Sequence, residues 1–246
     1  MKSLNEKVVL VTGSSRGIGA AIAELMAAEG AKVIVNYAGN KTEADKTVRA
    51  IEEKGGTAFA VQADVSQSDD VKRLFDKSID RFGKVDVLVN NAGIMLTSLV
   101  KDVTDEDFTR QFDINVRGTF NTLREAAHKL ADNGSIINFS STTTRVIIPT
   151  YGIYVATKGA VEQLSRVFAK EIASRGITVN TVSPGPTNTE LFINGKSQEA
   201  IDRSKSQSAF NRLGEPEDIA KAVVFLATDA AKWISAQNIG VNGGMA

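Results

Sequence analysis

The stretch YVATKG places a phenol, Tyr154, four residues before an ammonium group, Lys158. In a helix, residues at this spacing share one face, so both side chains point into the same space. A neighbouring positive charge stabilises a phenolate, and we expect Lys158 to lower the pKa of Tyr154 from its ordinary value of about 10. Such a tyrosine can donate a proton to a developing alkoxide or accept one from an alcohol. The pair alone is also a common chance match on amphipathic helices.

A second candidate site is the glycine-rich segment TGSSRGIG, residues 12–19, which follows the first apolar run and precedes a helical pattern. Glycines allow a tight turn there and let the backbone approach a pyrophosphate, while the free N–H groups of the helix N-terminus bind the anion. The spacing is GxxxGxG. The segment predicts a dinucleotide site, although many strand-to-helix turns need glycine for structural reasons alone.

The end of the second apolar run bears on the choice of nucleotide. A carboxylate about 20 residues after the glycines normally accepts the ribose hydroxyls of NAD. Here the run ends VNYAGNK, without a carboxylate. Arg16 and Lys41 offer positive charge to a 2′-phosphate, and Asn36 offers a neutral donor. The sequence therefore favours NADP over NAD as cofactor.

Short Val- and Ile-rich runs alternate with amphipathic stretches along the chain. The runs are Lys7 to Val11, Lys32 to Val35, Thr57 to Val61, Val85 to Val89, Ser135 to Phe139 and Thr178 to Val182. The helical patterns are Ile18 to Glu29, Thr42 to Lys54, Val71 to Phe82, Asp105 to Leu130, Tyr154 to Ser174 and Pro216 to Ala227. Consecutive apolar positions indicate parallel strands covered on both faces. We predict one α/β domain over residues 1–246: a Rossmann-type doubly wound sheet, mainly parallel with about seven strands, and helices on both faces.

The polar segment 188–212 lacks a strand-like run and follows the turn Pro184-Gly185-Pro186. We expect it to form a mobile lid over a substrate pocket, because lids have few buried contacts. The alternative is an ordinary surface excursion.

Bulk composition limits the function classes. The 29 basic residues balance the 29 acidic ones and the pI is about 6.6, so no excess positive charge favours nucleic acid or a membrane surface. The chain has no cysteine, which agrees with a reducing compartment, and the first apolar run is too short for a signal peptide or membrane span; we expect a cytoplasmic protein. The single histidine, His128, lies outside any GxSxG or HExxH motif, so we expect neither a hydrolase triad nor a metal site.

Five further motifs occur along the chain together with the glycine-rich segment and the Tyr154–Lys158 pair. They are Asp64-Val65, Asn90-Asn91-Ala92-Gly93, Ser140-Ser141 with Ser141 thirteen residues before Tyr154, Pro184-Gly185, and the ending Ile239 to Gly244. Together with TGSSRGIG and YVATK, in this order and spacing, they strongly resemble the short-chain dehydrogenase/reductase family over essentially the whole chain. The chain is similar to the 3-oxoacyl-acyl-carrier-protein reductase-like members of that family.

The resemblance implies four catalytic residues. Tyr154 matches the general acid/base, Lys158 the residue that lowers its pKa and holds the nicotinamide ribose, and Ser141 the hydroxyl that orients the carbonyl. Asn115 matches the helix asparagine that supports a proton-relay water. Ser140 competes with Ser141 for its role, and the family spacing favours Ser141.

The resemblance also implies the cofactor contacts, which come from several separate segments of the chain. They are Gly13, Arg16, Ile18 and Gly19 around the pyrophosphate; Asp64 and Val65 at the adenine; Asn91, Ala92 and Gly93 beside the cofactor; and Pro184, Gly185 and Thr189 at the nicotinamide, together with Tyr154 and Lys158. We also expect cofactor contacts from Ser15 and Gly17 in the glycine-rich segment, Asn36 and Tyr37 at the end of the second strand, and Thr187. In this family a basic residue at the position of Arg16 is usually a sign of NADP preference.

These features lead to one principal function and two alternatives. We expect an NADP(H)-dependent oxidoreductase that interconverts a ketone and a secondary alcohol by hydride transfer, without a metal. The first alternative is a 3-oxoacyl-acyl-carrier-protein reductase; Arg175 matches a basic position of carrier-protein users, but Asp132 stands where such enzymes tend to be basic. The second is a non-catalytic NADPH sensor, which would normally have lost Tyr154 or Lys158.

Substrate and assembly are expected from the resemblance as well. Family members contact substrate at positions that are apolar here: Met95, Leu96, Val146, Ile147, Ile148, Tyr151, Leu191 and Phe192. An apolar ketone or acyl chain suits them better than a highly charged sugar. Family members of this size usually form homotetramers through the two long helices and the C-terminal strand, and we expect the same here.

Overall fold

Seven short strands form one sheet within residues 3–246, the part of the chain that the computed structural model describes. The strands are β1 (Val8–Val11), β2 (Lys32–Tyr37), β3 (Thr57–Gln62), β4 (Val87–Asn90), β5 (Ser135–Phe139), β6 (Thr178–Pro184) and β7 (Asn238–Val241). Their order is β3-β2-β1-β4-β5-β6-β7, and every neighbouring pair is parallel. The predicted α/β class and parallel sheet are confirmed.

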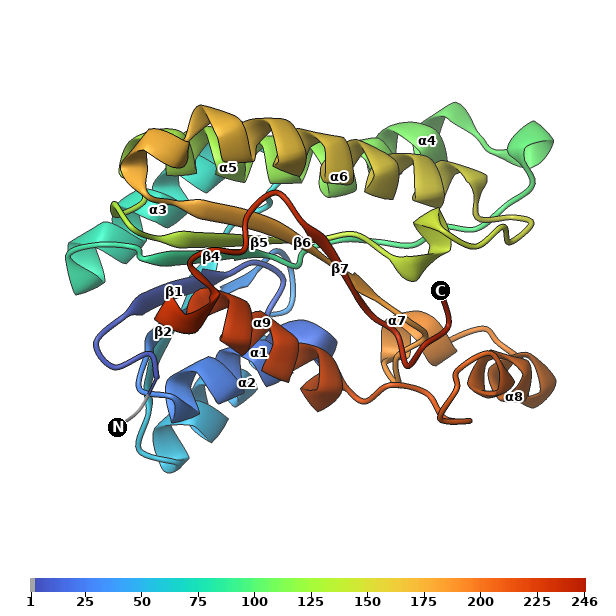
Figure 1. The fold of residues 1–246 in the computed structure, drawn as a ribbon, viewed down its shortest axis with the longest axis horizontal. Coiled ribbons are helices and arrows are strands. Elements are labelled where there is room, and N and C mark those ends of the chain that lie inside the picture. The colour runs from blue at the N-terminus through green and yellow to red at the C-terminus, as the bar shows by residue number, and fades with distance from the viewer. Residues whose placement is uncertain (1–2) are drawn as a thin grey trace.

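Helices cover both faces of this sheet (Figure 1). One layer contains α1 (Gly17–Ala28), α2 (Lys41–Glu53) and α9 (Pro216–Ala227); the other contains α3 (Ser68–Phe82), α4 (Asp105–Phe112), α5 (Gly118–Lys129) and α6 (Gly152–Glu171). Alternate side chains of β1 enter opposite cores: Val9 and Val11 join the cluster with α1 and α9, and Val8 and Leu10 join the cluster with α3 and α5. Because both faces are buried, the strands are apolar at consecutive positions.

The strand order reverses between β1 and β4, where the chain leaves the first half of the sheet for the second. In doubly wound sheets, ligands bind in the crevice at the carboxyl ends of the strands at this point. Thr12 follows β1 and Asn91 follows β4, and the side chain of Asn91 donates to the carbonyl oxygen of Thr12 at 3.0 Å. The topology therefore brings the glycine-rich loop and the turn Asn91-Ala92-Gly93, the NAG turn, to the same edge.

The helix predicted over Asp105 to Leu130 is interrupted. Between α4 and α5 the chain forms a π-helical turn, Asp113–Arg117, with Asn115 at its centre. Such turns occur often at functional sites, and the hydrophobic periodicity of the sequence does not reveal them. The strand β7 also lies outside the six Val- and Ile-rich runs, since its central residue is glycine.

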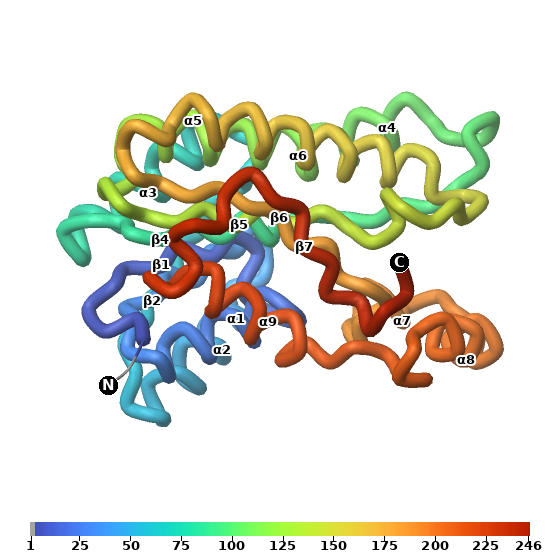
Figure 2. Tube along the Cα trace, viewed as in Figure 1, coloured from blue at the N-terminus to red at the C-terminus, as the bar shows by residue number. Residues whose placement is uncertain are grey.

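Segment 188–212 contains two short helices, α7 (Glu190–Ile193) and α8 (Gln198–Ser206), neither of which has a buried residue. Figure 2 shows the chain after β7 turning alongside this region. The backbone N–H of Ala209 donates to the carbonyl of Gly243 at 2.8 Å, so the C-terminal segment adjoins the end of the predicted lid. Among residues 3–246, none of the helices combines the length and the apolar character needed to cross a membrane.

Candidate active site

The glycine-rich loop leaves its backbone open to a ligand. Gly13 has φ +61°, and a Cβ built on it would lie 2.8 Å from the Cα of Ala92, so a side chain there would collide with the NAG turn. A Cβ on Gly19 would lie 2.5 Å from the side-chain nitrogen of Asn91. Arg16, the residue that precedes α1, makes no side-chain hydrogen bond to the first N–H groups of the helix. This arrangement fits a pyrophosphate bound by backbone amides.

Asn36 lies behind the loop and not at its open side. It is 1% exposed; its side-chain oxygen accepts from the N–H of Gly13 at 3.1 Å, and its amide donates to the carbonyl oxygens of Ala63 and Val61 at 3.0 and 3.3 Å. The expectation that Asn36 donates to a ribose phosphate is therefore corrected: its donors are used within the protein, where they fix the loop. Tyr37 is likewise buried, in the core beside α1.

Asp64 and Val65 close the loop after β3. Asp64 accepts from both the N–H and the hydroxyl of Ser66, at 2.9 and 2.8 Å. Val65 is buried against α5, where a Cβ on Gly118 would come within 2.6 Å of its methyl group. Gly118 thus lets α5 approach the loop expected to contact the adenine.

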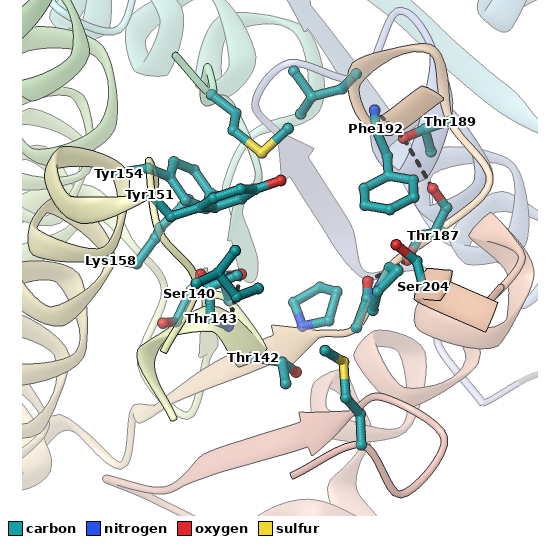
Figure 3. Close-up of a pocket in the computed structure, with 18 of the residues that line it drawn as sticks. Ser140, Thr142, Thr143, Tyr151, Tyr154, Lys158, Thr187, Thr189, Phe192 and Ser204 are labelled. Carbon is teal, nitrogen blue, oxygen red and sulfur yellow. Dashed lines mark hydrogen bonds between the residues drawn. The ribbon is translucent and has the colours of Figure 1, made fainter. Parts of the chain in front are cut away.

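Tyr154 and Lys158 project from the first turns of α6 toward the carboxyl end of β5 (Figure 3). The Lys158 Nζ donates to the carbonyl oxygen of Phe139 at 3.0 Å and lies 5.7 Å from the centre of the Tyr154 ring. The residue is only 5% exposed. The predicted i, i+4 pair therefore shares one face.

Burial outweighs charge in setting the acidity of this pair. It raises the pKa of Tyr154 to about 12, although a hydrogen bond with Ser141 acts in the opposite direction, and it lowers the pKa of Lys158 to about 8. The expectation that Lys158 lowers the pKa of Tyr154 is corrected for the chain itself. The reason is that the phenol itself is removed from water, while the Lys158 amine donates its hydrogen bond to the carbonyl oxygen of Phe139.

The two adjacent serines after β5 have different surroundings. The Ser140 hydroxyl donates to Glu162 Oε1 at 2.6 Å, whereas Ser141 Oγ accepts from the hydroxyl of Thr143 at 2.8 Å and interacts with Tyr154. The hydroxyl of Ser140 therefore already donates its hydrogen bond to Glu162. The geometry supports Ser141 as the serine that works with Tyr154.

Asn115 holds the loop after β4 against α6. Its side-chain oxygen accepts from the N–H of Ile94 at 2.8 Å, and its amide donates to the Ile94 carbonyl at 2.9 Å and to the Thr157 hydroxyl at 3.1 Å. A Cβ on Gly93 would lie 3.2 Å from this oxygen and 3.5 Å from Lys158 Nζ. The absence of a side chain at Gly93 lets Asn115 and Lys158 converge.

The turn after β6 forms the opposite side of the site. A Cβ on Gly185 would lie 2.9 Å from the Cα of Asn242, so only glycine lets this turn pass the C-terminal segment. The Thr187 hydroxyl donates to the Gly185 carbonyl at 2.9 Å, and Thr189 caps the N-terminus of α7. Thr189 also faces the glycine-rich loop, residues 12–19, which we call the phosphate loop. A Cβ built on Gly17 would lie 3.6 Å from the methyl group of Thr189.

A cavity of about 520 Å³ joins these groups (Figure 3). Its walls include Ile18, Asn91 and Gly93 on the nucleotide side, Ser141, Tyr154 and Lys158 on the catalytic side, and Pro184 to Thr187 and Thr189 below them. Of the eight expected apolar contacts, six line it: Met95, Ile147, Ile148, Tyr151, Leu191 and Phe192. Leu96 and Val146 do not. Hydroxyls and apolar groups together suit a mostly apolar molecule with one oxygen to be held.

Sequence reasoning missed the α8 wall of this cavity. Ala200, Arg203, Ser204 and Gln207 all line it, and their spacing is that of one helical face. That period is the signal that could have found them. Met245, near the C-terminus, also lines the cavity through the fold of the C-terminal segment, and no local pattern marks it.

Arg175 has a structural role. Its guanidinium donates to Asp132 Oδ1 at 2.7 Å and to the carbonyl oxygens of Ala127 and Leu130 at the end of α5. It ties α5 to the turn before β6, and Asp132 neutralises its charge. Among residues 3–246, no group of three or more acidic, histidine or cysteine side chains is placed to hold a metal ion.

Known proteins are similar to this chain over nearly its full length. A family model described as Enoyl-(Acyl carrier protein) reductase matches residues 13–246. The chain is 43% identical to a versicolorin reductase of Emericella nidulans, over 98% of this chain and 96% of that protein. It is also 43% identical to a 3-oxoacyl-acyl-carrier-protein reductase of Staphylococcus epidermidis, over 97% and 98%. Among solved structures, the angucycline C-6 ketoreductase LanV with bound NADP is similar, with a TM-score of 0.94 and 39% identity over 99% of this chain and 96% of that one.

The fold and the site are those of an oxidoreductase with a Rossmann-type nucleotide-binding sheet. The chain belongs to the short-chain dehydrogenase/reductase family.

Proposed function

We propose that this chain interconverts a ketone and a secondary alcohol with NADP(H), and that Tyr154 is its general acid/base. The observation that carries the proposal is a shared cavity: Tyr154 and Ser141 line it together with Ile18 from the phosphate loop and Gly185 from the turn after β6. We infer that a carbonyl group and a nicotinamide ring would meet in this cavity, in front of the two hydroxyls.

Each residue of the site has a separate role in the proposed reduction. A bound nicotinamide supplies the hydride that adds to the carbonyl carbon. Ser141 and Tyr154 donate hydrogen bonds to the carbonyl oxygen, and Tyr154 transfers its proton to that oxygen as the alcohol forms. Lys158, whose pKa is about 8, carries a positive charge at neutral pH. In the chain alone burial of Tyr154 outweighs this charge, and we propose that the ammonium stabilises the phenolate once proton transfer has formed it. Asn115 positions the loop that borders this amine.

The proposed preference for NADP rests on charge at the adenosine end. The second strand ends without a carboxylate, and Arg16 extends from the loop with its side chain 69% exposed. Both candidate cations are ion-paired, Lys41 with Asp45 on its own helix at 2.6 Å and Arg16 with Glu190 at 3.1 Å, but only Arg16 lies in the glycine-rich loop itself. Arg16 is thus the residue we assign to the 2′-phosphate, and the NADP bound by LanV is consistent with this assignment.

Carrier-protein reduction is the second candidate, supported by the 43% identical relative from Staphylococcus epidermidis. Arg175 does not support binding of a carrier protein, because its guanidinium donates hydrogen bonds to Asp132 and to two backbone carbonyl oxygens. The non-catalytic sensor is disfavoured by the shared cavity of Tyr154, Ser141 and Lys158. We also propose that segment 188–212 is the lid of the cavity. We propose further that the protein acts in the cytoplasm.

We also propose a homotetramer. Its support is apolar exposure on the layer that contains the long helices: Phe108 of α4, Phe120 of α5 and Val167 of α6 are 44%, 45% and 58% exposed.

The test is a rate measurement with NADPH and NADH against a panel of apolar ketones, sugars and acetoacetyl thioesters, followed by nicotinamide absorbance. We expect turnover of apolar ketones with NADPH, and weaker NADPH use in Arg16→Ala with little change for NADH. Equal losses for both nucleotides in that variant would contradict the cofactor assignment. Turnover restricted to thioesters would favour the carrier-protein reductase.

A further inference from the structure

An ion pair joins the phosphate loop to the proposed lid. Arg16 Nη1 lies 3.1 Å from Glu190 Oε2, the first residue of α7, and the two residues are 174 positions apart in sequence. Both side chains are about two-thirds exposed. Close approach of Thr189 to Gly17 places the two segments against each other beside this pair.

The pair is the main polar link of these lid helices to the cofactor side. Neither α7 nor α8 has a buried residue. Within residues 3–246, residues 190–206 make no other hydrogen bond or ion pair to the chain outside residues 187–214. The remaining ion pairs of the segment, Arg203 with Glu199 and Lys205 with Asp202, lie within α8.

The guanidinium in this pair is the group assigned above to the 2′-phosphate. A phosphate that binds Arg16 brings negative charge close to the Glu190 carboxylate, which either moves away or repels it. NAD(H) has the same pyrophosphate but no 2′-phosphate, so it lacks this additional negative charge beside Glu190. The two anions therefore compete for one cation only when the cofactor is NADP(H).

We propose that Glu190 is a specificity-determining residue that competes with the 2′-phosphate of NADP(H) for Arg16, so that NADP(H) releases α7 from the phosphate loop and NAD(H) does not. The proposal rests on the proposed function, because it takes Arg16 as the phosphate ligand. It gives Glu190 two effects: it moderates the preference for NADP(H), and it couples the identity of the cofactor to the freedom of the lid.

A double-mutant cycle tests the competition. NADPH and NADH affinities are measured by titration for the wild type, Glu190→Gln, Arg16→Ala and the double variant. Glutamine keeps the size of the side chain and removes its charge, so we expect NADPH to bind about three-fold more tightly in Glu190→Gln, a small effect because exposed ion pairs are weak and screened by salt. NADH affinity stays unchanged, and the gain for NADPH disappears in the Arg16→Ala background. Glu199→Gln, which removes an exposed glutamate from α8, is the matched control and leaves both affinities unchanged.

The outcomes separate this inference from the proposed function. If Arg16→Ala weakens NADPH selectively while Glu190→Gln leaves NADPH binding unchanged or weakens it, the competition is overturned and the cofactor assignment stands. If Arg16→Ala weakens both nucleotides equally, the cofactor assignment itself fails.

Hydrogen exchange tests the release of the lid. The two cofactors differ only by the 2′-phosphate, so we expect backbone amides of residues 190–206 to exchange faster in the NADPH complex than in the NADH complex. The difference shrinks in Glu190→Gln, where the link is weak with either cofactor. Equal exchange in the two wild-type complexes would overturn the proposed release.

Discussion

Tyr154 and Lys158 show opposite consequences of the same burial. Removing a group from water disfavours its charged form, so the pKa of the phenol rises to about 12 and that of the amine falls to about 8. At neutral pH the phenol therefore holds its proton, which is the form needed for reduction. We expect alcohol oxidation, which needs the phenolate, to be the slower direction at neutral pH.

The first prediction concerns the proton donor. Tyr154→Phe removes the hydroxyl without changing the ring, and we expect turnover to fall by at least about 100-fold, the usual range for a lost general acid. Nucleotide affinity, measured by titration, should change little. Tyr151→Phe, which removes a hydroxyl from the same cavity, is the matched comparison and should lose much less. Comparable losses in the two variants would contradict the assignment.

The second prediction concerns stability. Because the folded-state pKa of Lys158 is below its unfolded value of 10.5, folding is penalised while the amine is charged, by up to about 3 kcal/mol below pH 8. Lys158→Met removes this penalty at the cost of the hydrogen bond to Phe139, worth about 1 kcal/mol. We expect the variant to be inactive but more stable than the wild type at pH 7 in thermal unfolding.

The stability difference between Lys158→Met and the wild type should depend on pH. Between pH 8 and pH 10.5 the unfolded state binds more protons than the folded state at this lysine, so its contribution to wild-type stability rises with pH. The advantage of Lys158→Met should therefore shrink across that window. A constant or growing advantage would show that burial of the charge is not its cause.

At the scale of elements, the loop between β1 and α1 depends on the NAG turn after β4. Asn91 donates to the carbonyl oxygens of Thr12 and Gly13, at 3.0 and 2.9 Å, and Asn36 holds the N–H of Gly13 from the other side. The phosphate loop is thus fixed by two neighbouring strand ends before any ligand binds, which reduces the ordering cost of binding.

The third prediction tests this fixed geometry. Gly13→Ala places a methyl group 2.8 Å from the Cα of Ala92 in a left-handed conformation, so the loop must move, and we expect nucleotide affinity to fall at least about ten-fold. Gly39→Ala is the control, because among residues 3–246 its built Cβ has no heavy atom within 4 Å apart from the adjoining residues of the chain, and its φ is not positive. Titration of both variants with NADPH is the measurement. Unchanged affinity in Gly13→Ala would contradict the proposed role of the loop.

At the scale of the whole molecule, exposed large apolar side chains occur on the layer of α4, α5 and α6, and also at Phe225 of α9 and at Trp233 before β7. Single exposed apolar side chains are ordinary, but aromatic and branched residues on adjacent long helices suit a subunit interface.

The fourth prediction is the native mass. We expect sedimentation to give four times the 26.2 kDa of one chain, and Val167→Asp, a charge on the exposed face of α6, to lower the mass without lowering helix content. A wild-type mass of one chain would contradict the proposed tetramer. An unchanged mass in the variant would place the interface elsewhere.

The sequence by itself determined the elements whose pattern is local. Consecutive apolar residues such as those of β1 and β4 specified strands buried on both faces, because a parallel sheet covered by two helix layers permits no polar alternation. The spacing of Tyr154 and Lys158 specified a shared helix face, and the glycines of TGSSRGIG specified the open loop. These features follow from covalent geometry and the helical period, which act over a few residues.

Only the tertiary structure decided what each group does with its neighbours. Asn36 supports the loop from behind because Val61 of β3 and Ala63, just after that strand, lie beside it. The pKa of Tyr154 rises because distant segments exclude water from it. The hydrogen bonds of Asn115 to Ile94 and Thr157, and the pair of Arg16 with Glu190, likewise join segments far apart in the chain. Burial and long-range contact depend on how the whole chain packs, so no local pattern in the sequence could have specified them.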